Sequence, residues 1–161
     1  MADLKLWGNL YQELAELFSN GLETVEWIDL WHNQVGFLVE EHPFSTPSLF
    51  LGFRILNAED EGRHMQKLLV QLDVYYFYET FLDTFNGAYN ETDALAYLNT
   101  VTDIHALLHG KSGTYFSEAK RIAFAPVDTG SAGNLYRQSF SMLVEDYSAS
   151  PADDQAIPGE V

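Results

Sequence analysis

The stretch Met65–Thr80, MQKLLVQLDVYYFYET, decides the fold of this 161-residue chain. Two sets of side chains alternate along it, which is the period of a β-strand. One set is apolar or aromatic throughout: Leu68, Val70, Leu72, Val74, Tyr76 and Tyr78. The other set mixes Leu69, Tyr75 and Phe77 with Lys67, Gln71, Asp73 and Glu79. A helix is the competing interpretation of so apolar a run, but the β-branched and aromatic content favours a strand. We therefore predict a long strand with aromatic side chains on both faces.

Further strands are predicted on both sides of this one. Alternating or β-branched runs occur at Val25–Asn33, Ser48–Ile55, Glu118–Val127 and Leu135–Tyr147. A proline-containing loop at Glu40–Pro47 and a polar connection at Asn57–Arg63 separate the earlier ones. Because neighbouring strands with short connections usually run antiparallel, we expect a mostly antiparallel sheet of four to five strands.

Two segments have the periodicity of amphipathic helices. The first carries an apolar stripe and ends at Asn20-Gly21; the stripe consists of Trp7, Leu10, Tyr11, Leu14, Leu17 and Phe18. The second begins at Asn90 or Thr92 and closes at Gly110; its stripe consists of Leu95, Leu98, Val101, Ile104, His105 and Leu108. The predicted order is α-β-β-β-α-β-β, an α+β fold with both helices on one face of the sheet. We expect a single domain over residues 1–147 and a flexible acidic tail over residues 148–161.

Charge excludes several classes of partner. The chain has 8 Lys and Arg against 24 Asp and Glu, a formal net charge of −16. This balance argues against a protein that binds DNA, RNA or an anionic membrane tightly. No apolar run approaches the roughly 20 residues that span a bilayer. Basic residues are absent between Lys5 and Arg54, and again after Arg137. This distribution has two interpretations: solubility, or a surface kept negative so that something slides past it or is repelled.

No chemical motif predicts an enzyme. His105 and His109 lie four residues apart on one helix face, a spacing that can bind a metal, but no third ligand is visible in the sequence. A partly buried histidine and a histidine at the helix C-terminus are the favoured interpretation. The chain has no cysteine, no nucleophile elbow and no complete phosphate-binding loop. We therefore predict no catalytic residue, no cofactor and no metal, with His105 and His109 as weak metal candidates.

Aromatic side chains suggest an interface. Trp27, Trp31, Tyr75 and Phe77 belong to strands whose aromatic side chains occur on both faces, and only one face can meet the helices. The other face either forms a subunit interface or is covered by the chain's own loops, and the sequence leaves both possibilities open.

The order of these features resembles the tail terminator proteins of long-tailed bacteriophages and prophages, also called tail-completion or minor tail proteins. The segments that carry the resemblance are NLYQELAELF, EWIDLWHNQ, HPFSTPSLFLGF, QLDVYYFYET, ALAYLNTVTDIHALLHG, RIAFAPVDTG and NLYRQSFSMLVEDY. They cover nearly the whole chain up to Tyr147 as an ordered set of individually weak motifs. Head–tail joining and neck proteins have similar small domains and stay an alternative.

The resemblance implies a structural protein of the virion tail, assembled in the cytoplasm of the host bacterium. Such proteins form hexameric rings that cap the tail tube, end its polymerisation and contact a head-completion or neck protein. DNA passes through the central hole without specific binding, and a negative lumen would keep it from sticking. Loops at Asn33–Pro47 and Asp128–Gly133 are candidate contacts with the tube or neck, which adds Phe44 and Asp128 to the predicted interface residues.

Two hypotheses of other classes stay open. One is a small metal-dependent enzyme or metal-binding domain that uses His105 and His109. The other is an acidic binding module that imitates DNA or inhibits a host factor.

Overall fold

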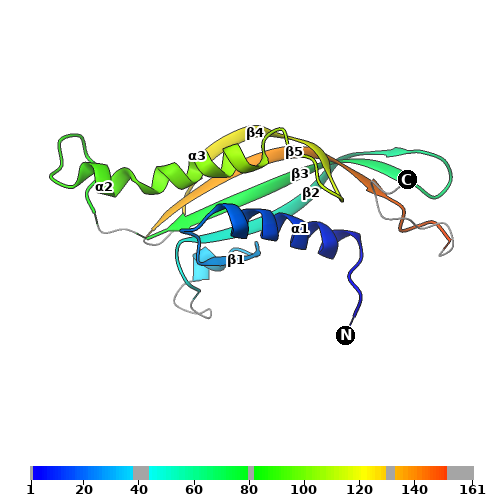
Figure 1. Cartoon of the computed structure of the whole chain (residues 1–161), viewed down its shortest axis with the longest axis horizontal. Helices are drawn as coiled ribbons and strands as arrows, with labels where there is room; N and C mark the ends of the chain where they lie inside the picture. Colours follow the sequence, from blue (N-terminus) through cyan, green and yellow to red (C-terminus); the bar gives the residue numbers. More distant parts are fainter. Residues whose placement is uncertain (1, 38–43, 80–81, 130–132, 152–161) are drawn as a thin grey trace.

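The computed structural model describes residues 2–37, 44–79, 82–129 and 133–151. Figure 1 shows its elements: α1 (Leu6–Gly21), β1 (Trp27–Leu30), the 3-10 helix η1 (Gln34–Phe37), β2 (Ser48–Asp60), β3 (Gln66–Tyr78), α2 (Glu91–Leu95), α3 (Tyr97–Leu108), β4 (Ser117–Val127) and β5 (Asn134–Asp146). The predicted α+β class and the order of helices and strands are confirmed. The predicted flexible tail lies outside the described residues from position 152 onward.

The strands form a five-stranded sheet in the order β1-β2-β3-β5-β4. β3 lies at its centre and pairs antiparallel with β2 and β5. β1 corrects the expectation of antiparallel neighbours, because it runs parallel to β2, with Trp27 opposite Ser48. The physical reason is the connection between them, which is long enough to carry the chain through η1 and back to the end where β1 began.

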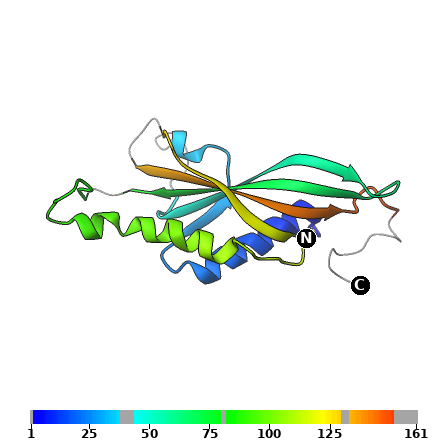
Figure 2. The same ribbon diagram turned by 90° about the horizontal axis from the view of Figure 1, so that it is seen from above.

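α1 and α3 cover one face of the sheet, as Figure 2 shows. The apolar stripe of α1 buries Leu10, Leu14 and Phe18, and α3 buries Ile104 and Leu108. These side chains form one core with alternate side chains of the strands; the largest strand contributions are Leu49, Leu51, Leu68, Leu72, Tyr76 and Phe140. Burying a side chain of this size stabilises the fold by about 1.5–3 kcal/mol, so the helix stripes hold both helices to the sheet.

The chain covers one end of the opposite face itself. Phe77 is fully buried there and Tyr75 is 9% exposed, in a cluster with side chains from the β1–β2 connection. The ring of Trp31 stacks on that of Tyr75 with centroids 3.9 Å apart, and the ring of Phe44 lies 5.1 Å from that of Phe50. At this end of the sheet the second of the two predicted possibilities therefore holds, and no partner is needed to cover the aromatic side chains.

β2 is longer than predicted. Its expected end was Ile55, and Asn57–Arg63 was expected to be a connection, but the strand runs to Asp60. Asn57 to Asp60 pair with β3 across a bulge after Ile55, and every side chain from Arg54 to Asp60 is exposed. The pairing satisfies the backbone while these side chains stay exposed. The hairpin therefore projects beyond the helices (Figures 1 and 2).

The predicted second helix is divided in two. α2 ends at Leu95 and α3 begins at Tyr97, because the N–H of Ala96 donates to the carbonyl of Asp93, three residues back, instead of continuing the α-helical pattern. The predicted closing residue Gly110 follows the end of α3 with φ +79°, a conformation that favours glycine.

Candidate interaction surfaces

The sheet ends in two strands that have only one described neighbour each, β1 and β4. Their outer edges carry backbone groups that pair with no described strand, and such edges can associate with another chain. Both edges also expose large apolar side chains. Trp27 of β1 is 40% exposed, and Ile122 and Phe124 of β4 are 53% and 46% exposed. These edges are the main candidate interaction surfaces.

A groove runs between α1 and the outer edge of β1. It has a volume of about 470 Å³, and its lining includes Glu16 from the helix and Glu26 and Trp27 from the strand region. Glu16 and Glu26 are exposed. All residues that line the groove fall between positions 12 and 28, and no Lys or Arg occurs anywhere in residues 6–53. We call this feature the acidic groove. Its chemistry suits a partner that offers an apolar side chain flanked by positive charge.

The opposite edge of the sheet has the reverse charge. Lys120, Arg121, Ile122 and Phe124 are all exposed along the middle of β4, and Glu118 and Asp128 lie only at or beyond its ends. We call the segment 120–124 the basic edge. The ring of Phe124 stacks on that of Tyr136 with centroids 5.5 Å apart, which fixes its direction while leaving nearly half of its surface exposed. The basic edge therefore presents a cationic and apolar surface.

Side chains from both helices hold β4 and the segment before it in place. The carboxylate of Glu13 on α1 accepts hydrogen bonds from the backbone N–H groups of Thr114 and Tyr115, at 2.8 and 3.1 Å. Nδ1 of His109, at the end of α3, accepts one from the backbone N–H of Arg121 at 3.0 Å. Both helices are thus tied to the chain that leads into the basic edge.

The two histidines predicted as weak metal candidates do lie together, with ring centroids 4.7 Å apart. His109 uses Nδ1 to accept from Arg121, and Nδ1 of His105 is buried without a described partner. Burial lowers the pKa of His105, and the neighbouring Arg121 and His109 lower it further. Within the described residues, no group of three or more His, Asp or Glu side chains could hold a metal ion.

The other predicted interface residues occupy different environments. Trp31, Tyr75, Phe77 and Phe44 come together in the covered aromatic cluster, with Tyr75 and Phe77 buried. Trp27 is exposed in the acidic groove, far along the sheet from Asp128, which is exposed just after β4. The structure thus brings four of the six residues together and leaves the two exposed ones at opposite edges.

Sequence reasoning missed the basic edge. The run KRIAF at Lys120–Phe124 holds two cations beside two large apolar side chains in a chain of net charge −16. That contrast was a usable signal, but the strand pattern alone did not show that β4 would lie at the end of the sheet. A second exposed apolar feature, at Phe85 (64%) and Tyr89 (107%) before α2, was also missed because the segment reads as an ordinary turn.

No protein-family model matches the chain, and no curated protein matches it. None of the helices in the described ranges is long and apolar enough to cross a membrane.

Proposed function

We propose that the chain is a structural subunit that joins with copies of itself into a ring and acts as a tail terminator of a long-tailed bacteriophage or prophage. The observation that carries the ring is the sheet order β1-β2-β3-β5-β4, which leaves two different edges at opposite ends of one rigid sheet. Both edges expose apolar side chains. The more specific proposal of a tail terminator is supported in addition by the resemblance in the order of motifs along the chain.

A subunit with two unlike surfaces at opposite ends repeats the same contact from copy to copy. When the rotation between neighbours closes, the result is a ring, and the resemblance to tail terminators favours a ring of six. Such a ring would cap the tail tube, end its polymerisation and offer its other side to a head-completion or neck protein. The ring would be part of the virion tail, assembled in the host bacterial cytoplasm.

The net charge of −16 suits a ring through which DNA moves. Phosphates bind where Lys and Arg gather, and a lumen rich in carboxylates repels them. This chain would then conduct the duplex without holding it. A catalytic role has no part in the proposal, and the histidine pair is assigned to structure: His109 ties α3 to the basic edge.

The test is a tube polymerisation assay with the tail tube protein of the same phage or prophage. Tubes grown with the chain should stop at one end, and electron microscopy should show a ring of added density there. Tubes that grow equally with and without the chain, and carry no added density, would contradict the proposal. Binding to isolated head-completion protein but never to tube ends would favour the neck-protein alternative.

A further inference from the structure

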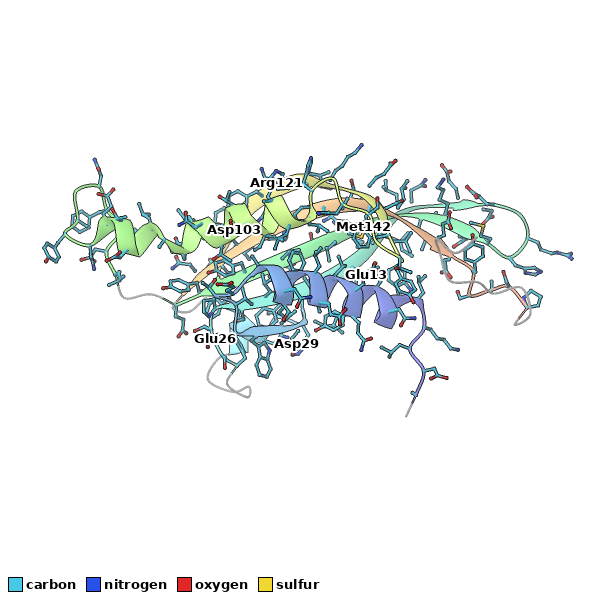
Figure 3. All side chains as sticks on the ribbon, viewed as in Figure 1. Glu13, Glu26, Asp29, Asp103, Arg121 and Met142 are labelled. Atoms are coloured by element: carbon cyan, nitrogen blue, oxygen red, sulfur yellow. The ribbon has the colours of Figure 1, made fainter. Side chains whose placement is uncertain are left out.

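The two sheet edges differ in charge as well as in position. Figure 3 places Glu26 and Asp29 on the β1 side of the molecule and Arg121 on the β4 side. Neither Glu16 nor Glu26, and neither Lys120 nor Arg121, forms an ion pair with another described residue. Within the described residues, these four charges are therefore not engaged in ion pairs of the same copy.

The apolar parts of the two edges also complement each other. The acidic groove has room for side chains beside Trp27, since its volume of about 470 Å³ lies in the range of ligand-sized pockets. The basic edge offers Ile122 and Phe124, both about half exposed. Aromatic side chains and arginine are the residue types that most often anchor an interface between proteins.

From this complementarity we infer that the basic edge of one copy docks into the acidic groove of the next, head to tail. The inference rests on the ring-forming part of the proposed function and names the surfaces that meet. Contact between two basic edges would bring Lys120 and Arg121 of both copies together, and contact between two acidic grooves would do the same for Glu16 and Glu26. Like charges oppose both symmetric arrangements, so the contact is between unlike surfaces.

Side chains, rather than continuous strand pairing, make this contact. β4 has register irregularities between Ser117 and Lys120 and between Arg121 and Ala123. Further along the strand, Pro126 has no N–H to donate. Bulges and proline on an edge strand protect it against indiscriminate pairing. The docking specificity then comes from charge and from the fit of Ile122 and Phe124 beside Trp27.

A second copy fits the basic edge better than DNA does. The edge carries only a small cluster of cations on a molecule of net charge −16, so a duplex would meet strong repulsion from the rest of the surface. The acidic groove of another copy supplies the opposite charge over a matching small area. DNA binding to the basic edge is the competing outcome, and the experiment must distinguish it from docking of a second copy.

The absence of cysteine allows a direct test by cross-linking. The full chain is prepared as Glu26→Cys, as Lys120→Cys and as the double variant, and each is treated with a short bis-maleimide at rising protein concentration, alone and with tail tubes. Single variants should stay monomeric on a denaturing gel, and an equal mixture of the two should give a dimer. The double variant should give a ladder that ends at the ring size. Glu59→Cys on the exposed end of β2 is the matched control, and it should give no cross-linked dimer when it is mixed with Lys120→Cys.

Charge reversal provides the second arm. Glu16→Lys/Glu26→Lys and Lys120→Glu/Ile122→Asp should each weaken self-association at least tenfold in sedimentation velocity, with unchanged circular dichroism. An equal mixture of the two should recover heterodimers, because each variant keeps the surface that the other lacks.

Efficient cross-linking within either single-cysteine variant, or unchanged assembly of both charge variants, would overturn the inference. If tubes are still capped in that case, the proposed function stands and only the docking surfaces are wrong. If Lys120→Glu/Ile122→Asp abolishes DNA binding but leaves self-association unchanged, the basic edge is a DNA-binding surface instead.

Discussion

The hydroxyl of Ser139 on β5 donates a hydrogen bond of 2.6 Å to Oδ1 of Asp73 on the neighbouring strand β3. The side-chain amide of Gln71 donates to the same oxygen at 2.9 Å. All three lie on the sheet face opposite α1 and α3, beyond the aromatic cluster. A carboxylate in the middle of the sheet is thus held by two neutral donors.

We expect Ser139→Ala to destabilise the fold by about 1.5–3 kcal/mol, because the substitution removes a hydrogen bond to a charged group from a residue that is only 3% exposed. Urea unfolding followed by tryptophan fluorescence measures the change. Ser48→Ala is the matched control on the same face. The Ser48 hydroxyl is buried without a described partner, so its removal should be neutral or stabilising by up to about 1 kcal/mol. Equal losses for both variants would contradict this account.

Glu13 is predicted to hold the segment before β4 against α1. Glu13→Ala should lower the free energy of unfolding by about 1–3 kcal/mol, since two backbone N–H groups lose a charged acceptor. Glu13→Gln should cost less, because the amide oxygen can still accept one of the two bonds. The exposed neighbour Gln12→Ala is the control and should change stability by less than about 0.5 kcal/mol. Hydrogen exchange at Thr114 and Tyr115 should speed up only in the Glu13 variants.

Stability should depend on pH through His105. Its pKa in the folded chain lies below the ordinary value of 6.5, chiefly because of burial. Below pH 6.5 the unfolded chain therefore takes up the proton more readily, so this contribution is complete above that pH and decreases as the pH falls. Between pH 7 and pH 5 we therefore expect the free energy of unfolding to fall more in the wild type than in His105→Gln, which has no group to protonate at this position. A difference that stays constant over this range would contradict the assignment.

Alkaline titration tests the tyrosine contact between α3 and β5. Burial and a hydrogen bond with Tyr136 raise the pKa of Tyr97 to about 12. Its contribution to stability is present below pH 10 and is lost as the pH rises from 10 towards 12. Ultraviolet absorbance should show one fewer late-ionising tyrosine in Tyr97→Phe. An unchanged number of late-ionising tyrosines in Tyr97→Phe would contradict this assignment.

The core of the fold follows from local pattern. Alternation along Met65–Thr80 predicts β3, since a period of two leaves one face of that strand continuously apolar. The stripe that contains Leu10, Leu14 and Phe18 likewise predicts α1 and its buried face. Both predictions succeed because the side chains concerned contact the core directly.

The features that sequence reasoning missed depend on neighbours instead. The parallel direction of β1 depends on the path of the chain through η1, and the exposed end of β2 is held by pairing with β3 rather than by burial. The position of Ile122 and Phe124 at an open edge depends on β4 being the last strand of the sheet. None of these relationships has a local period, so alternation and helix stripes could not reveal them.

The central claim is that unlike edges of one sheet join copies of the chain into a closed ring. Native mass spectrometry over a range of protein concentrations tests it most directly. The account predicts a single closed species of six 18.2 kDa chains, with short open intermediates at low concentration and none larger at high concentration. A chain that stays monomeric at every concentration and on tube ends, or that forms only a symmetric dimer, would contradict it.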